Sequence, residues 1–317
     1  MVKSRKINVG ITIGDPNGIG IEIILKSLSD FSLFHECNFI IYASTDLIEK
    51  QKKHFQIDTP SIIKINSEED VLDTQINIKE VFSNSQFNFG ESDKELSALG
   101  ILSLKEATKA IKDKKIDVLV TAPINKDLSF SESFKYTGHT DFLKNYFRIS
   151  PLMLMISKEL KIALLTDHIP IKDVSNAINQ DIVEQKIKAL EKSLINDFQI
   201  KKPKIAVLAV NPHAGDNGVI GNEDQSIITP AINTFKGTTS SINGPFSADT
   251  FFVNENYKKY DGIIASYHDQ GLIPFKTISF GKGVNFTAGL PFVRTSPDHG
   301  TGLSLIHISE PTRRYRI

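Results

Sequence analysis

Residues 7–28, INVGITIGDPNGIGIEIILKSL, contain an apolar run, a glycine-rich turn and a helical pattern in that order. The run Ile7 to Ile13 predicts a buried strand. Four apolar residues then recur at the spacing of an amphipathic helix: Ile21, Ile24, Leu25 and Leu28. The order strand, turn, helix predicts the opening unit of an α/β domain.

The glycines of this turn do not have the spacing of a nucleotide-binding loop. They stand at positions 14, 18 and 20, so the pattern G-x-G-x-x-G is absent, and no lysine of the Walker type follows. A tight turn that leads into a helix is therefore favoured over a phosphate cradle.

The alternation of strand and helix continues along the first half of the chain. The apolar run Phe39 to Ala43 precedes a helix for which Ser44 or Thr45 is a candidate N-cap. Further predictions are a strand at 61–65, a polar, turn-rich stretch at 66–90, a helix at 92–114 and a strand at 118–121. Such alternation is typical of a parallel α/β sheet.

The second half of the chain predicts a sheet that is not purely parallel. The apolar runs 152–156 and 161–165 are close enough in sequence to pair as strands, so a mixed sheet is expected. The other elements predicted here are an amphipathic helix at 181–194, a strand at 205–210, a helix around 224–235 and a strand at 262–265.

Length and composition favour a two-domain protein that acts on a small molecule. The 317 residues, 40% hydrophobic and 23% charged, exceed the usual size of one domain. Lysine plus arginine equals aspartate plus glutamate at 37 each, which argues against nucleic acid or a membrane surface as partner. No run approaches the ~18 apolar residues of a membrane span. Cys37 is the only cysteine, so an internal disulfide is excluded and a cytoplasmic location is expected.

Three of the eight histidines follow apolar, strand-like runs: His168, His213 and His268. Ligand-binding groups of α/β proteins stand at the ends of strands. One histidine in such a place is more often an ordinary hydrogen-bonded residue, but three in matched contexts favour a catalytic divalent-metal site. No HxxxH pair is present, so spacing alone does not show that the three converge.

Acidic residues accompany these histidines. Asp167 and Asp269 are direct neighbours of two of them, and Asp216 follows the third within the sequence HAGD. They are candidates to accept hydrogen bonds from the imidazoles and so to orient them. Helix capping or turn formation accounts for them equally well.

Two further segments have residues suited to an anionic substrate. His139 and Thr140 follow a glycine at a helix-like start, a grouping that suits phosphate or carboxylate. Lys276, Asn285 and Arg294 lie in turn-rich sequence, where separated cations can enclose an anion. Taken singly, each cation is more simply explained as a solvated surface residue.

Together these motifs resemble one family, the 4-hydroxythreonine-4-phosphate dehydrogenases and their relatives that act on four-carbon hydroxy-acid phosphates. Several of the matching blocks are long and specific to the family. They extend over nearly all of residues 7–302: ITIGDPNGIG, VTAPINK, YTGHTDFL, LLTDHIP, NPHAGDNGVIGNED, GPFSADTFF, SYHDQGLIPFK and GVNFTAGLPFVRTSPDHGTG.

The resemblance implies an α/β, two-domain fold like that of isocitrate and isopropylmalate dehydrogenases, with mixed sheets and the active site in the interdomain cleft. The first domain is expected at 1–135 plus about 288–302. The second, with the dimer interface, is expected at 136–287. A homodimer with a shared active site follows from the same resemblance.

The resemblance also implies roles for individual residues. The implied metal ligands are His168, His213 and His268, the third from the partner subunit. The implied substrate-binding residues are His139, Thr140, Lys276, Asn285 and Arg294. Neither the general base nor the cofactor-binding residues are assigned.

The implied reaction is NAD-dependent oxidation of 4-phosphooxy-L-threonine to 2-amino-3-oxo-4-phosphooxybutanoate in pyridoxal phosphate (pyridoxine) biosynthesis. A divalent metal, Zn²⁺, Mg²⁺ or Co²⁺, acts as a Lewis acid on the alcohol, and NAD accepts the hydride. The new ketone lies β to the carboxylate, so loss of CO₂ can give 3-amino-2-oxopropyl phosphate.

Three alternatives stay open at this point. A relative that oxidises erythronate- or threonate-4-phosphate uses a substrate that differs only in its α-substituent. A metal-dependent phosphohydrolase could use the same histidines and cations, and it would release phosphate without NAD. A non-enzymatic remnant would bind metal or nucleotide without turnover.

Residues 303–317, LSLIHISEPTRRYRI, depart from the family pattern. They lack a helical apolar face and contain Pro311, whereas the resemblance implies a final amphipathic helix on the first domain. We therefore expect an aberrant tail in place of the authentic terminus. Apolar surface exposed by loss of a helix costs ~25 cal/mol per Å², so reduced stability is expected.

Overall fold

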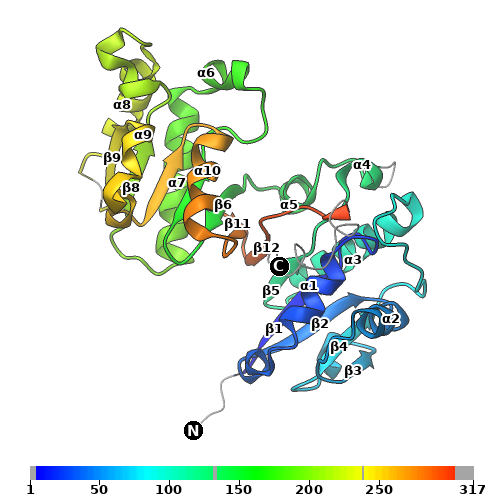
Figure 1. Cartoon of the computed structure of the whole chain (residues 1–317). Coiled ribbons are helices and arrows are strands. Elements are labelled where there is room, and N and C mark those ends of the chain that lie inside the picture. The colour runs from blue at the N-terminus through cyan, green and yellow to red at the C-terminus, as the bar shows by residue number, and fades with distance from the viewer. Residues whose placement is uncertain (1–4, 131–133, 238, 304–317) are drawn as a thin grey trace. The chain divides into compact units, whose positions relative to one another are not determined.

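The computed structural model describes residues 5–130, 134–237 and 239–303 (Figure 1). The tail expected at 303–317 lies outside these residues except for Leu303. The chain divides into two compact units. The first contains residues up to Ile149 and from Pro291 onward, and the second contains Ser150–Leu290. In sequence, the second unit is therefore an insertion into the first.

The first unit contains a sheet whose described strand pairs are all parallel. Its strand order is β3-β4-β2-β1-β5-β12. The strands are β1 (Ile7–Thr12), β2 (Cys37–Ala43), β3 (Ile62–Ile65), β4 (Ile76–Glu80), β5 (Val118–Thr121) and β12 (Val293–Pro297). The expected strands at 7–13, 39–43, 61–65 and 118–121 are thus confirmed.

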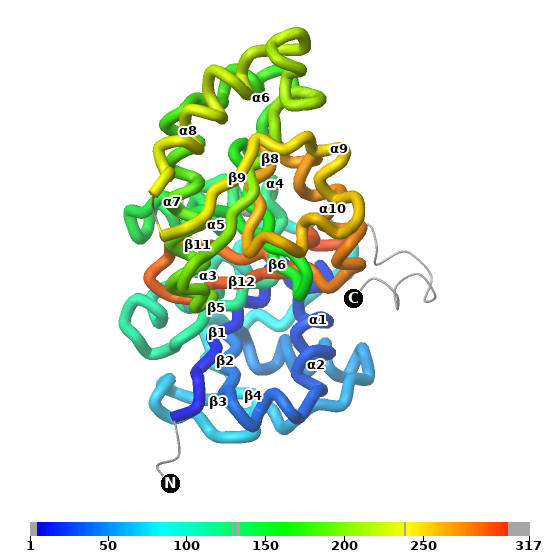
Figure 2. The backbone as a smooth tube through the Cα atoms, turned by 90° about the vertical axis from the view of Figure 1, so that its left-hand side faces the viewer, coloured from blue at the N-terminus to red at the C-terminus, as the bar shows by residue number. Residues whose placement is uncertain are grey.

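Helices cover both faces of this sheet. Strand β2 alternates: Phe39 and Ile41 pack in one apolar cluster with α1 and α2, which lie side by side in Figure 2. Tyr42 lies on the opposite face, where Ser103 of α3 donates to its carbonyl oxygen. The helices of the unit are α1 (Gly20–Ser27), η1 (Phe31–His35), α2 (Thr45–Phe55), η2 (Glu68–Asp70), α3 (Lys94–Lys112), α4 (Lys126–Ser129) and α5 (His139–Phe147).

The second unit contains a mixed sheet of order β11-β6-β7-β10-β8-β9. Strand β6 is antiparallel to both β7 and β11, and the other described pairs are parallel. The strands are β6 (Leu152–Ile156), β7 (Lys161–Leu164), β8 (Lys204–Leu208), β9 (Ser241–Phe246), β10 (Gly262–Ala265) and β11 (Val284–Ala288). The pairing expected of the two apolar runs is confirmed, and so is the mixed sheet.

Two apolar clusters lie on opposite faces of this second sheet. One contains α7 and α8, and the other contains α9 and α10. The helices are η3 (Ile171–Asp173), α6 (Val174–Ala177), α7 (Gln180–Asn196), η4 (Pro212–Gly218), η5 (Asp224–Ile228), α8 (Thr229–Asn233), α9 (Ala248–Phe251), η6 (Val253–Lys259) and α10 (His268–Ser279). Among the described residues, none of these or the other helices has the length and apolar character needed to cross a membrane.

The glycine-rich turn after β1 is a buried structural element. Residues 13–20 are all buried, and the backbone N–H of Ile19 donates to Thr301 O at 3.0 Å. A Cβ added at Gly20 would lie 2.6 Å from the carbonyl oxygen of Ile13. The glycines therefore permit close backbone packing, which supports a tight turn over a phosphate cradle.

Gly100 of α3 lies against the same turn and gives a test of this packing. A Cβ added there would lie 2.3 Å from the backbone oxygen of Gly14, so relief requires movement of the helix or the turn. We expect Gly100→Ala to lower the free energy of unfolding by about 1–3 kcal/mol, measured by denaturant titration. Gly300→Ala is the control, because nothing lies within 4 Å of a Cβ added there. Equal stability of both variants would contradict the proposed packing.

Candidate active site

Two of the three candidate histidines lie together at the ends of β7 and β10. These parallel strands are neighbours, and their pairing continues into the loops, where the Thr166 hydroxyl donates to Ser266 O at 2.8 Å. His168 and His268 each follow two residues later. Their ring centres are 5.1 Å apart and their planes are inclined by 46°. Their positions just after two strands in the sequence thus correctly indicated that these two histidines lie close together.

The pair has a geometry that suits one shared divalent ion. With Zn–N bonds of about 2.1 Å, two imidazoles on a tetrahedral ion have ring centres about 5 Å apart. Nδ1 of His268 lies 2.7 Å from Oδ1 of Asp269, which orients the ring and leaves Nε2 to bind. Beside His168, Oδ1 of Asp167 is buried without a hydrogen-bond partner in the described part of the chain. The donor set therefore fits a divalent metal.

His213 does not join this pair. Across residues 5–130, 134–237 and 239–303, no group of three or more His, Cys, Asp or Glu side chains could hold an ion. Asp224 turns the loop after β8, because its carboxylate accepts the backbone N–H groups of Val210 (2.8 Å) and Asn211 (3.0 Å). Residues 213–217 then all have positive φ, so the chain runs in a left-handed turn. Within the described part of one chain, the imidazoles of His168 and His268 lie together, and that of His213 is not grouped with them.

The carboxylate of Asp269 gives a graded test of the pair. We expect Asp269→Asn to weaken zinc binding about 10–100-fold, because an amide accepts a hydrogen bond from the imidazole less well and adds no charge. Competition with a chromogenic chelator measures the affinity. Asp181→Asn is the matched control, because Asp181 is an exposed residue in the first turn of α7, and it should bind zinc like the wild type. Unchanged affinity in Asp269→Asn would remove this residue from the site.

Arg294 and His139 form a second group of polar residues, in the first unit. Arg294 of β12 is 2% exposed, and burial lowers its pKa to about 10. His139 is the first residue of α5. Burial, and then the positive charges of Arg294 and Lys126, lower the pKa of His139 well below 6.5. Its Nε2 is buried and has no hydrogen-bond partner within the described ranges. A neutral imidazole near two cations is a suitable environment for an anionic ligand.

The depressed pKa of His139 predicts a pH dependence of stability. The folded state keeps this imidazole neutral, whereas the unfolded chain takes up a proton below a pH of about 6.5. Stability should therefore fall as pH falls below about 6.5, by up to about 1.4 kcal/mol per pH unit, with no contribution above it. Denaturant titrations of wild type and His139→Gln give the difference. An equal acid loss in both proteins would argue against a neutral imidazole at His139.

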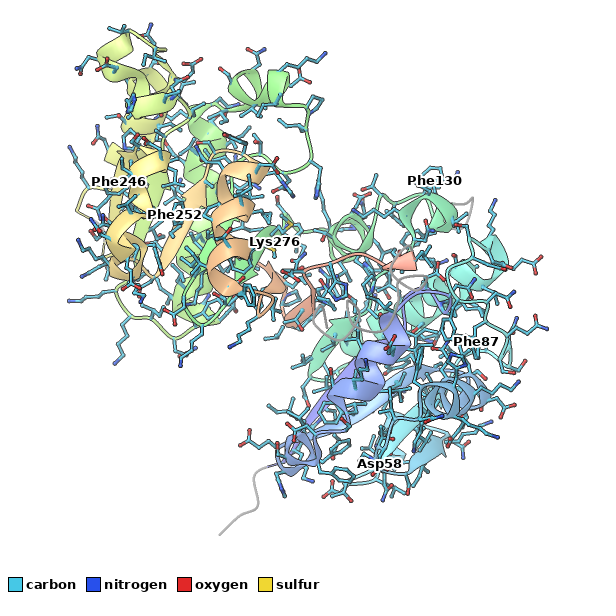
Figure 3. The ribbon with its side chains drawn as sticks, in the orientation of Figure 1. Asp58, Phe87, Phe130, Phe246, Phe252 and Lys276 are labelled. Atoms are coloured by element: carbon cyan, nitrogen blue, oxygen red, sulfur yellow. The ribbon has the colours of Figure 1, made fainter. Side chains whose placement is uncertain are left out.

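The other expected substrate residues occupy separate elements. Lys276 projects from the last turn of α10 and is exposed (Figure 3). Asn285 of β11 is half-buried, and its Oδ1 has no hydrogen-bond partner in the part of the chain that the structure describes. Thr140 is half-buried as the second residue of α5.

Sequence reasoning missed two residues that support these groups. The Gln270 side chain accepts the backbone N–H of Ser266 at 2.7 Å and donates to Ala209 O at 2.8 Å, joining the ends of β10 and β8. The hydroxyl of Thr121 accepts from Nε (3.2 Å) and Nη2 (2.5 Å) of Arg294. Gln270 stands in the block SYHDQGLIPFK and Thr121 in VTAPINK. Neither residue belongs to a sequence pattern whose spacing would mark it as functional.

A cleft of about 870 Å³ lies at the amino-terminal ends of the strands in the first unit. Its lining mixes both signs of charge and includes Arg5, Lys6, His35, Glu68 and Asp113. None of the expected site residues lines it. Ligands of parallel α/β sheets bind at the carboxyl ends of strands, so the cleft is not assigned to the site.

Comparison with known proteins adds the decisive observation. The family model of the pyridoxal phosphate biosynthetic protein PdxA matches residues 35–309. The chain belongs to this family. As a PdxA family member it is an enzyme, and more specifically an oxidoreductase.

The chain is similar to PdxA relatives over nearly its whole length. It is 41% identical over 309 residues to the 4-hydroxythreonine-4-phosphate dehydrogenase of Sulfurihydrogenibium sp., covering 96% of this chain and 94% of the relative. It is 33% identical to an Oceanobacillus iheyensis relative assigned to D-threonate 4-phosphate dehydrogenase, covering 95% and 92%. The crystal structure of the Klebsiella pneumoniae 4-hydroxythreonine-4-phosphate dehydrogenase aligns with TM-score 0.83 at 30% identity, covering 96% and 92%.

Proposed function

We propose that this chain is an NAD-dependent, divalent-metal-dependent 4-hydroxythreonine-4-phosphate dehydrogenase of pyridoxal phosphate biosynthesis, located in the cytoplasm. Its substrate is 4-phosphooxy-L-threonine. The pair His168 and His268, whose ring centres are 5.1 Å apart, carries the proposal, because it offers two ligands for one ion in a chain of the PdxA family.

The residues of the chain bind and orient the reactants in this proposal. His168 and His268 would hold the ion, and Asp269 fixes the ring of His268. When bound, the metal would supply Lewis-acid polarisation of the alcohol, and NAD would supply the hydride acceptor. Arg294 keeps its charge in a buried site and binds an anionic end of the substrate.

The remaining substrate contacts follow from the family blocks. His139, Thr140, Lys276 and Asn285 are proposed to bind the substrate, and a neutral His139 can donate or accept a hydrogen bond there. The product is 2-amino-3-oxo-4-phosphooxybutanoate. As a β-keto acid it loses CO₂ to give 3-amino-2-oxopropyl phosphate.

A homodimer is part of the proposal, because the ion needs a third imidazole. The resemblance implies His268 as the ligand from the partner subunit, but within one chain the described residues bring His168 and His268 together. We therefore propose that the partner subunit's His213, and not the partner's His268, completes the set. Each histidine has an exposed apolar side chain a few residues further along the sequence: Ile171 is 71% exposed, Val219 82% and Ile273 64%. Such exposed apolar side chains support a surface that a partner subunit covers. Light scattering on the purified protein measures its mass in solution, and a monomer would oppose the shared site.

The direct test is formation of NADH, followed by absorbance, from 4-phosphooxy-L-threonine and NAD. Zn²⁺, Mg²⁺ and Co²⁺ are added in turn, with and without chelator. Turnover that requires metal and NAD supports the proposal. Release of phosphate without NAD would show a phosphohydrolase instead.

A second candidate substrate class is threonate- or erythronate-4-phosphate. It is favoured by the Oceanobacillus iheyensis relative, which is 33% identical over 308 residues. The two substrates differ at the α-substituent, amine against hydroxyl. Comparison of kcat/KM for both under identical conditions assigns the preference.

A further inference from the structure

The block VTAPINK begins within β5 and contains a residue that no proposed role has used. Thr121 is the last residue of β5 and is fully buried. Its Oγ1 accepts two hydrogen bonds from Arg294, from Nε at 3.2 Å and from Nη2 at 2.5 Å. One hydroxyl oxygen therefore contacts two donors of the same guanidinium and fixes the plane of that group.

The register of the sheet explains how the two side chains meet. Strands β5 and β12 are parallel, and Arg294 is paired with Leu119. Side chains two residues apart on a strand share a face, so Arg294 emerges on the same face as Thr121. The guanidinium thus extends toward the carboxyl end of β5, the end at which α/β sheets bind ligands.

The acceptor of these two Arg294 hydrogen bonds is an uncharged hydroxyl, that of Thr121. Arg294 is only 2% exposed, so its donors need acceptors that replace water. A carboxylate at position 121 would supply an acceptor and also neutralise the cation. The hydroxyl of Thr121 supplies an acceptor that adds no negative charge beside Arg294.

We propose that Thr121 is a positioning residue for substrate binding: its hydroxyl holds the guanidinium of Arg294 in the orientation that receives one anionic group of the phosphorylated substrate. This inference rests on the proposed function, in which Arg294 binds the substrate. Thr121 itself does not touch the substrate.

The neighbouring strand offers a matched control. Thr12 of β1 is the direct register partner of Thr121 in β5 and is equally buried. Its Oγ1 has no hydrogen-bond partner among the residues described. Thr12→Val and Thr121→Val therefore make the same chemical change at adjacent buried positions, and only the second removes a contact with Arg294.

The test compares KM and kcat of Thr121→Val, Thr121→Ser and Thr12→Val, together with their thermal unfolding. We expect Thr121→Val to raise KM about 10-fold or more, because it removes hydrogen bonds to a charged group. Thr121→Ser keeps the hydroxyl and should restore KM to nearly the wild-type value, and Thr12→Val should not change it. Unchanged KM in Thr121→Val, or a serine variant as weak as the valine one, would overturn the inference.

Binding without turnover separates this inference from the proposed function. If the wild type oxidises none of the four-carbon phosphates, the proposed function fails, and calorimetry with inorganic phosphate then tests Thr121. Phosphate binding that needs Arg294 and weakens in Thr121→Val, but not in Thr12→Val, supports the positioning role. Phosphate binding that is absent, or that is equal in all variants, refutes it.

Discussion

Replacing His268 by alanine is expected to lower kcat/KM about 1000-fold or more. The change removes one of two imidazoles whose ring centres are 5.1 Å apart, and with it the hydrogen bond to Asp269. Lewis-acid stabilisation of a developing charge contributes several kcal/mol, and each 1.36 kcal/mol corresponds to about tenfold in rate. Initial rates of NADH formation and metal content by mass spectrometry provide the measurement.

His35→Ala is the matched control for this prediction. His35 lies in the last turn of η1, in the first unit, and is exposed. The control should retain wild-type activity and metal content. A His268→Ala enzyme that kept both its zinc and its turnover would exclude the His168/His268 pair as the metal site.

The second large effect is expected at Arg294. Methionine fills a similar volume without charge, so Arg294→Met should lower kcat/KM about 100-fold or more, mainly through KM. The same substitution leaves the buried Thr121 hydroxyl without its two donors from Arg294, so the free energy of unfolding should fall by about 1–3 kcal/mol. A loss of affinity much larger than this loss of stability is the result that distinguishes a binding residue from a structural one.

Arg5→Met is the control for this second prediction. Arg5 is in the same unit, and its side chain is 70% exposed and lies 3.5 Å from Asp117. Exposed ion pairs contribute about 0–1 kcal/mol, so neither KM nor stability should move much. Strong destabilisation of Arg294→Met with an unchanged KM would show that Arg294 acts in folding and not in binding.

The sequence predicts that two of the three candidate metal ligands lie together, but not that the third is separate from them. His168 and His268 follow apolar runs that form adjacent parallel strands, so their approach could be expected from strand ends alone. The separation of His213 could not be expected, because Asp224, which turns its loop, lies well beyond it in sequence. Contacts of this kind depend on the three-dimensional fold and have no local signal.

Strand β4 is a second feature that the sequence did not predict. Residues 66–90 were expected to form turns, but Ile76–Glu80 is a strand between β2 and β3. Asn77 is the second residue of this strand, and asparagine is disfavoured in strands. Its buried amide donates to Phe39 O and Leu72 O and accepts from Leu72 N, so the tertiary structure satisfies it. The prediction from strand propensity failed there because backbone groups of Phe39, far away in sequence, and of Leu72 supply the partners of the amide.

The insertion of one unit into the other sets an order for biosynthesis. During translation, Ser150–Leu290 leaves the ribosome before β12, the strand that completes the sheet of the first unit. The inserted unit can close early, because its first and last strands, β6 and β11, pair with each other. The first unit must wait for its final strand, and Arg294 reaches Thr121 only then. The nascent chain thus completes the unit that contains His168 and His268 before the unit that contains Arg294.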